Sequence, residues 1–529
     1  MTKRLSMRWA VAIAAGAVLA TAAIVAPGVV SQAKPDSASP AELKGFDRLK
    51  WGPCAAPPGQ PLPPALQCAT ISVPLDYGKT FGSRISIAVS RLKTSKPGVR
   101  RGVILANAGE PGRPGLYLPL QLSGELSPAV LDRYDLIGFD PRGVGQSSPV
   151  SCGLRHELLN VSDIYPYPEG DGDIAANIAY SKEVARACAK NEPRMLRHLT
   201  TKNIARDMDR IRAALREPKI SYLGFSSGSY LGSTFGELFP HRTDRIVLDS
   251  GGHPNRMWRG IFQNWAPATK VRFPDFTTWL ASQDATYHLG RNPAELEKLY
   301  LKLAADLDTR PVRLPARPLF SGVLDGNTFR EVNRQGLSGD GYFPALAALW
   351  QGVRDRLPAP RLTERIAPFF PDGFPIEQVE RTVSALYVMG CADAPWPRSV
   401  PQYIAEVKAS RSAHPVTAGM PKNIVSCAFW PFTPTDKPVN ITGRGAKNVL
   451  MLNNTHDPAS PYEGALALRK AFGDRARLVT VDGGGHGTLF HFMSRATPNA
   501  CADRFVEDFL VHGRRPASDR TCTPDTGKR

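Results

Sequence analysis

The sequence predicts an α/β protein: a mostly parallel sheet with helices on both faces and an inserted, mainly helical cap. Three observations predict it. Short apolar runs alternate with segments of helical periodicity up to about residue 250, a pattern typical of parallel strands joined by crossover helices. Residues 251–446 break this rhythm, which resumes at 447. An apolar run at 219–223 passes through Gly-x-Ser-x-Gly directly into a helix of small residues.

The N-terminal 33 residues are predicted to be a secretion signal. Three basic residues precede an apolar run from Trp9 to about Val25, and a small-residue cleavage site ends at Ala33. The run is short and broken by glycine and proline, which favours export with cleavage over a membrane anchor. Residues 34–45 are rich in proline, serine and alanine and are expected to form a disordered lead-in.

The formal net charge of +18 is spread along the chain. Basic residues form no run with interleaved aromatic residues, so nucleic acid is not a predicted partner. The charge is compatible with attraction to an anionic cell envelope or to acidic substrates. After the signal, no stretch of the sequence is long and apolar enough to span a bilayer, and no stable membrane insertion is expected.

The cysteines agree with export. Their number is even and none forms a closely spaced metal-type pair, so disulfides outside the cytoplasm are the natural interpretation. Eight cysteines can pair in many ways, and the sequence does not choose among them. Pairing neighbours in order closes the smallest loops and is the arrangement expected here: 54–68, 152–188, 391–427 and 501–522.

The first part of the sheet domain is assigned to residues 46–250. Its expected strands cover 71–77, at an edge of the sheet, 83–92, 102–107, 134–139, the run before the Gly-x-Ser-x-Gly turn, and 245–249. A helix is expected at 203–215, where apolar residues recur at helical spacing. Because the carboxyl ends of parallel strands share one edge, the loops that follow these strands are expected to meet there.

Residues 251–446 are assigned to the cap, because they are helical in pattern, broken by prolines, and hold six of the eight tryptophans. The second part of the sheet domain is assigned to 447–529. It is expected to contain strands at 447–453 and 477–481, with a helix at 461–472 between them.

The Gly-x-Ser-x-Gly turn is typical of a nucleophile elbow, with Ser226 as the nucleophile. In such a turn the serine has strained backbone and an exposed hydroxyl. Gly224 and Gly228 are expected because a Cβ at either position would clash where strand and helix approach each other. Ser227 begins the helix, and its backbone N–H is one candidate donor to an oxyanion.

A serine hydroxyl needs a base and a group that orients the base. In this fold the acid and then the histidine follow the serine along the chain, which selects Asp457 and His486, each after a late strand. The reverse assignment, with His456 as base and Asp482 as acid, breaks that order. His491 is expected on a helix surface or behind the site.

A second oxyanion donor is expected from the loop at 107–115, where Gly109 and Glu110 are the candidates. No metal or cofactor is predicted for this chemistry.

As an alternative to its role beside the base, Asp457 before a proline could simply form a turn.

Several stretches spread over the chain resemble the secreted actinobacterial α/β-hydrolase peptidases of the tripeptidyl aminopeptidase and proline iminopeptidase type. They include Asp-Pro-Arg-Gly-Val-Gly at 140–145, the elbow at 222–232, Cys-Ala-Phe-Trp-Pro at 427–431 and Gly-His-Gly at 485–487. The resemblance implies an α/β-hydrolase fold with an inserted cap, no metal, and release of short peptides from free N-termini. By position, Ser226, Asp457 and His486 match the family's triad.

The loop at 107–115 departs from the family's glycine-rich pattern, because it reads Asn-Ala-Gly-Glu-Pro-Gly-Arg-Pro-Gly. A backbone N–H survives the change to Glu110, but a carboxylate beside a developing oxyanion would oppose catalysis. Glu110 could bind the α-ammonium group of a substrate. It could instead pair with Arg113 and face solvent, which is the interpretation we favour.

The leading hypothesis is a secreted serine exopeptidase that acts on peptides through an acyl-enzyme. A second keeps the triad and makes the substrate an ester or a specialised amide, since an aromatic cap would suit an acyl chain. A third is a binding protein that keeps the fold without the oxyanion function. The complete set of Ser226, Asp457 and His486 argues against the third.

Overall fold

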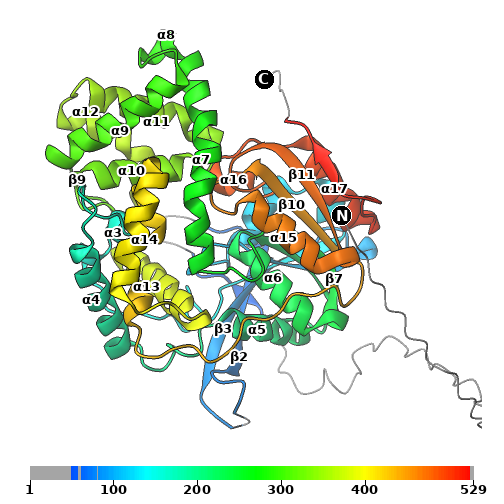
Figure 1. Cartoon of the computed structure of the whole chain (residues 1–529). Helices are drawn as coiled ribbons and strands as arrows, with labels where there is room; N and C mark the ends of the chain where they lie inside the picture. The colour runs from blue at the N-terminus through cyan, green and yellow to red at the C-terminus, as the bar shows by residue number, and fades with distance from the viewer. Residues whose placement is uncertain (1–48, 57–60, 80, 525–529) are drawn as a thin grey trace, which may run out of the picture. The chain divides into compact units, whose positions relative to one another are not determined.

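A ten-stranded mixed sheet forms the centre of the protein (Figure 1), in the order β1-β2-β3-β5-β4-β6-β7-β10-β11-β12. The computed structural model describes residues 49–56, 61–79 and 81–524; the predicted signal and lead-in lie outside them. The strands are β1 (Gly52–Pro53), β2 (Leu66–Pro74), β3 (Arg84–Leu92), β4 (Gly102–Asn107), β5 (Tyr134–Phe139), β6 (Ile220–Phe225), β7 (Thr243–Asp249), β10 (Val449–His456), β11 (Ala476–Gly484) and β12 (Arg520–Cys522).

Neighbouring strands from β5 to β12 are parallel, whereas β1, β2 and β3 pair antiparallel at one side. This confirms the predicted, mostly parallel sheet. The strand expected at 71–77 is the second half of β2, which ends at Pro74. β1 pairs outside β2 only at Gln67 and Cys68, so residues 71–74 lie at the edge of the sheet as expected. Strands β10 and β11 extend three residues further than expected, to His456 and Gly484.

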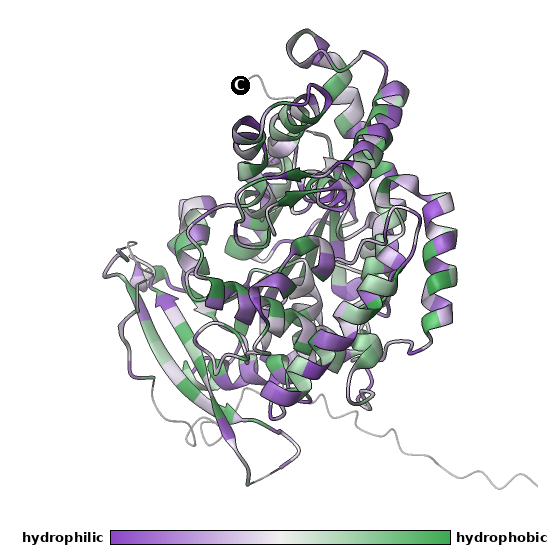
Figure 2. Cartoon of the chain, turned by 90° about the vertical axis from the view of Figure 1, so that its left-hand side faces the viewer, coloured by the Kyte–Doolittle hydropathy of each residue, from purple (hydrophilic) through white to green (hydrophobic). Residues whose placement is uncertain are grey.

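Side chains alternate between the two faces of the sheet, as a two-residue period requires. Along β4, Val103 and Leu105 join one buried cluster while Ile104 and Ala106 join the other. Five helices supply much of the cover: α5 (Thr201–Ala214), α6 (Ser227–Leu238) and α15 (Tyr462–Phe472) on the first face, and α1 (Leu118–Glu125) and α17 (Ala500–His512) on the second. Surface helices carry hydrophobic residues on one side and hydrophilic residues on the other (Figure 2).

All eight cysteines are paired as neighbours along the chain, which confirms the expected arrangement. The four bonds are Cys54–Cys68, Cys152–Cys188, Cys391–Cys427 and Cys501–Cys522. Disulfides of this number are typical of proteins that function outside the cytoplasm. In a separate observation, none of the helices within residues 49–524 is both long and apolar enough to cross a membrane.

Residues 251–446 leave the sheet after β7 and return at β10, although these two strands are neighbours. As expected, the segment is mainly helical (Figure 1). Its longer helices are α7 (Arg259–Ser282), α9 (Pro293–Thr309), α10 (Gly326–Gly336), α11 (Phe343–Arg354), α12 (Ala359–Ile366), α13 (Ile376–Asp393) and α14 (Val400–Ala413), and a small hairpin joins β8 (Val312–Arg313) to β9 (Val323–Leu324).

The inserted segment contributes to two different cores. Helices α7 and α9 to α12 bury their own aromatic cluster, with Trp350 fully enclosed. Helix α13 instead joins the sheet's core through residues such as Val383 and Val388. Trp350 is therefore a core residue of the inserted segment, and Trp430 is a core residue of the sheet. Core packing explains both of these tryptophans.

A buried ion pair fixes the turn after β5. The Arg142 and Asp207 side chains have no exposed surface, and two guanidinium nitrogens each donate to a carboxylate oxygen at 2.7 Å. Arg142 also donates to the carbonyl oxygens of Pro74, Leu75 and His198. The arginine of the Asp-Pro-Arg-Gly turn therefore holds together segments that are far apart in the chain.

Replacing Arg142 with alanine is expected to lower the free energy of unfolding by about 3–5 kcal/mol, because Asp207 would keep a buried, uncompensated charge. The matched control is Arg101→Ala, which breaks the half-exposed pair with Asp244 and should cost about 0.2–1 kcal/mol. Equilibrium urea denaturation measures both. Equal losses in the two variants would contradict this account of Arg142.

Candidate active site

Ser226 lies at a sharp turn between β6 and α6. Its backbone has φ 53° and ψ −120°, and its N–H donates to the carbonyl oxygen of Asp249 at 2.9 Å. A Cβ on Gly224 would lie 2.5 Å from the carbonyl oxygen of Gly228. A Cβ on Gly228 would lie 2.7 Å from Oδ1 of Asn107, on the neighbouring strand β4. Both glycines are thus required as predicted, though Gly228 is restricted by β4.

His486 and Asp457 are in direct contact. Nδ1 of His486 lies 3.0 Å from Oδ1 and 2.9 Å from Oδ2 of Asp457. The Asp457 side chain has no exposed surface, and its Oδ1 also accepts the N–H groups of Ala459 and Ser460. Asp457 therefore forms the local turn and contacts the imidazole at once, so the two interpretations of this residue do not exclude each other.

The imidazole of His486 lies against the residue that precedes Ser226. The ring centroids of Phe225 and His486 are 4.5 Å apart. The backbone N–H of His486 donates to the carbonyl oxygen of Ser338, in the inserted segment, at 2.7 Å. Among the described residues, no hydrogen bond joins the Ser226 hydroxyl to His486. Such bonds are commonly long without substrate and tighten when it binds.

His456 and Asp482 do not form the base and acid pair of the reverse assignment, because each contacts another residue. Nδ1 of His456 contacts both carboxylate oxygens of Asp275 in α7, at 2.9 and 3.0 Å, while Asp482 accepts from the Thr455 hydroxyl. His491 lies 3.6 Å from Glu125. Asp275 lies in the inserted segment, and no local pattern in the sequence connects it to His456.

The 107–115 loop lies directly on the elbow. Gly109 has φ +86°, and a Cβ there would lie 2.3 Å from the Phe225 carbonyl oxygen and 3.0 Å from Cβ of Ser226. Its N–H donates to Oδ1 of Asn107 at 3.0 Å. The Ser227 hydroxyl donates to the Gly109 carbonyl oxygen at 2.7 Å and ties the loop to α6.

Of the three candidate oxyanion donors, Gly109 is therefore engaged elsewhere. The N–H groups of Glu110 and Ser227 donate to no other residue among 49–56, 61–79 and 81–524. These two N–H groups are the ones available to an incoming oxygen.

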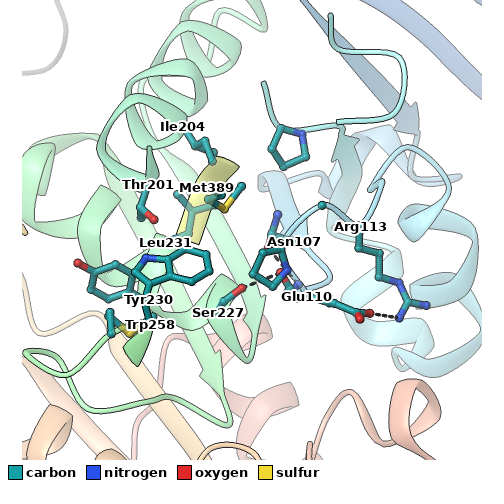
Figure 3. Close-up of a pocket in the computed structure, with 15 residues that line it drawn as sticks. Asn107, Glu110, Arg113, Thr201, Ile204, Ser227, Tyr230, Leu231, Trp258 and Met389 are labelled. Carbon is teal, nitrogen blue, oxygen red and sulfur yellow. Dashed lines mark hydrogen bonds and ion pairs between the residues drawn. The ribbon is translucent and has the colours of Figure 1, made fainter. Parts of the chain in front are cut away.

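A pocket opens beside this loop (Figure 3). The loop forms one wall, the start of α6 another, and Trp258 and Met389 of the inserted segment close it. Neither Ser226 nor His486 lines it. In the sequence, only the tryptophans of residues 251–446 indicate the side of the pocket that Trp258 and Met389 form.

Glu110 and Arg113 pair on one side of that pocket, with 3.6 Å between Oε2 and a guanidinium nitrogen (Figure 3). The favoured interpretation of Glu110 is thus observed. The Glu110 side chain remains 59% exposed, so a solute can still reach it. Burial, and next the charge of Glu110, raise the pKa of Tyr165.

Comparison with known proteins gives the family. Residues 413–522 match the family model described as TAP-like protein. The chain is 33% identical over 484 residues to a tripeptidyl aminopeptidase of Streptomyces lividans, which covers 90% of this chain and 87% of that protein. The chain belongs to the tripeptidyl aminopeptidase family. With its mostly parallel sheet, helices on both faces and strand–serine–helix elbow, it has the α/β-hydrolase fold.

Other relatives carry different names. The chain is 28% identical to serine protease Hip1 of Mycobacterium tuberculosis, over 98% of both chains. It is 29% identical to carboxylesterase B of the same species, over 87% of this chain and 86% of that protein. The family relationship makes the protein a serine hydrolase of the peptidase type.

Gly109→Ala is expected to lower the free energy of unfolding by about 1–3 kcal/mol, because a left-handed residue would gain a Cβ against the elbow. The control is Gly98→Ala, where an added Cβ meets no atom within 4 Å and the change should stay within about 0.5 kcal/mol. Thermal denaturation followed by circular dichroism compares them. A Gly109 variant as stable as the control would contradict the close approach.

Proposed function

We propose that the protein is a secreted serine exopeptidase that releases short peptides from free N-termini. Ser226 is the nucleophile, His486 the base and Asp457 the acid that orients the base. The observation that carries this proposal is the His486–Asp457 contact beside the strained turn of Ser226.

The chemistry follows from these positions. Ser226 Oγ attacks the scissile carbonyl carbon while Nε2 of His486 accepts the hydroxyl proton. Asp457 holds Nδ1–H of the ring and stabilises the imidazolium. The C–N bond then breaks, the proton passes to the leaving amine, and water hydrolyses the acyl-enzyme by the same route.

The N–H groups of Ser227 and Glu110 are proposed as the oxyanion donors. Neither N–H has an acceptor in the part of the chain that the structure describes, and the N-terminal dipole of α6 favours negative charge at the same place. In this role Glu110 acts through its backbone, while its side chain turns toward Arg113.

Peptide substrates are proposed because the Streptomyces relatives are named tripeptidyl aminopeptidases. We also propose that residues 251–446 act as a cap on the site. This is supported by two contacts: Ser338 accepts the His486 N–H, and the Trp265 indole donates to the carbonyl oxygen of Ala459, two residues after Asp457.

Export through a cleaved signal at 1–33 remains our proposal. It is supported by four disulfides in the described chain and by the sequence of the N-terminus. Cleavage would remove Lys3, Arg4 and Arg8 and lower the net charge from +18 to +15, which would still favour retention at an anionic cell envelope.

Ser226→Ala is expected to reduce kcat on a tripeptide anilide by at least about 10⁴-fold, because no other hydroxyl can replace the nucleophile. The control is Ser227→Ala, which keeps the backbone donor, loses only the hydroxyl bond to Gly109, and should cost less than about 10-fold. Steady-state turnover and mass-spectrometric labelling with an organophosphonate report the result. Undiminished turnover in Ser226→Ala would refute the proposal.

Glu110 is proposed to bind the substrate's α-ammonium group when a peptide displaces the Arg113 contact. Glu110→Gln should then raise KM for a free-amine tripeptide anilide by about 10–100-fold, the value of a charged hydrogen bond. Turnover of p-nitrophenyl acetate, which has no amine, should not change. Arg113→Gln is the control and should leave KM for the peptide the same or lower. If KM for the peptide is unaffected in Glu110→Gln, another acid binds the amine.

A further inference from the structure

We infer that Asp249 is a positioning residue that fixes the nucleophile and the base relative to each other, an inference that rests on the proposed function. Asp249 is the last residue of β7, the strand between the elbow strand β6 and the acid-bearing strand β10. It is fully buried, so it touches neither solvent nor a substrate.

The main chain of Asp249 holds the nucleophile's side of the site. Its carbonyl oxygen accepts the N–H of Ser226 at 2.9 Å and the hydroxyl of Ser229 at 2.7 Å. The first bond restrains the strained residue itself, and the second restrains the first turn of α6.

The side chain of the same residue holds the base's side. The N–H of Thr488 donates to both carboxylate oxygens at 2.9 Å, and the N–H of Phe490 donates to Oδ2 at 2.8 Å. The residue after Asp249 holds a third N–H group of this loop, since the Ser250 hydroxyl accepts the N–H of Gly487. The loop that follows His486 is therefore bonded to the end of β7.

The buried loop after His486 needs a hydrogen-bond acceptor at the position of the Asp249 carboxylate. Burial raises the pKa of Asp249 to about 6, while the N–H groups of Phe490 and Thr488 and the nearby His486 favour its charged form. Near neutral pH, hydrogen bonds from Thr488 and Phe490 therefore stabilise the charged Asp249 carboxylate. The carboxylate in turn restrains the loop that contains these two residues. Without an acceptor here, the two N–H groups would be buried unpaired, and the loop would move to satisfy them.

The role is distinct from that of Asp457. No hydrogen bond within the described chain joins the Asp249 carboxylate to the His486 ring, whereas Asp457 contacts Nδ1 directly. Asp249 therefore sets the distance and direction of the His486 imidazole relative to Ser226. A displacement of the imidazole by about 1 Å is enough to slow a reaction by about 100-fold.

The test compares Asp249→Ala, Asp249→Asn and a control on the same strand, Asp244→Asn. Asp244 lies near the opposite end of β7 and pairs with half-exposed Arg101. Each folded variant is measured for kcat and KM on a tripeptide anilide, for the rate of Ser226 phosphonylation, and for amide hydrogen exchange in peptides spanning 485–493. If the alanine variant does not fold, Asp249→Ser, which leaves a smaller cavity, takes its place.

Asp249→Ala should lower kcat and the phosphonylation rate by about 100-fold, leave KM within about threefold, and speed exchange at 485–493. Asp249→Asn keeps a carbonyl acceptor at the position of Oδ2 and should recover most of the activity. The control should match the wild type in all three measurements. Wild-type kcat and wild-type exchange in the alanine variant would overturn the inference, as would an equal loss in the alanine and asparagine variants with unchanged exchange.

The exchange measurement separates this inference from the proposed function. If the wild-type protein neither turns over peptides nor reacts with the phosphonate, the proposed function fails. Faster exchange at 485–493 in the alanine variant would then still support the restraint by Asp249, and unchanged exchange would reject it.

Discussion

Ser226 has a backbone conformation that a residue with a Cβ adopts only under restraint, at a cost of about 1–3 kcal/mol. Its φ of 53° turns the chain from β6 into α6 within one residue. That turn is possible because Gly224 and Gly228 allow backbones to approach more closely than a Cβ permits. The hydrogen bond from Ser226 N–H to Asp249 then holds the turn to the neighbouring strand.

The arrangement of the remaining groups follows from the sheet. Strands β6, β7, β10 and β11 are consecutive neighbours and parallel, so their carboxyl ends lie at one edge. Ser226 follows β6, Asp457 follows β10, and His486 follows β11. The long insertion leaves between β7 and β10 without disturbing their pairing, and it contacts the loops of this edge through Ser338, Trp265 and Asp275.

Much of this was accessible from the sequence, because it rests on local patterns. Apolar runs gave the central strands nearly to the residue, and the glycines around Ser226 reported a close approach that the backbone requires. The expectation that neighbouring cysteines pair, because they close the smallest loops, is confirmed by all four disulfides. The catalytic roles of Ser226, Asp457 and His486 stay a prediction that awaits the kinetic tests.

The failures concern contacts between distant parts of the chain. The two residues of β1 and the three of β12 are too short to show a period, so neither was foreseen. The engagement of the Gly109 N–H by the Asn107 side chain depends on the exact path of a proline-rich loop. The pairing of His456 with Asp275 and the packing of α13 in the sheet's core require tertiary structure, which residue patterns do not encode.

The most direct measurement is a crystal structure of the protein after reaction with an organophosphonate. The account predicts phosphorus bonded to Ser226 Oγ, its phosphoryl oxygen within hydrogen-bond distance of the Glu110 and Ser227 N–H groups, and Nε2 of His486 facing the adduct. An unmodified Ser226 in folded protein, or an adduct whose oxygen turns away from those two N–H groups, would contradict it.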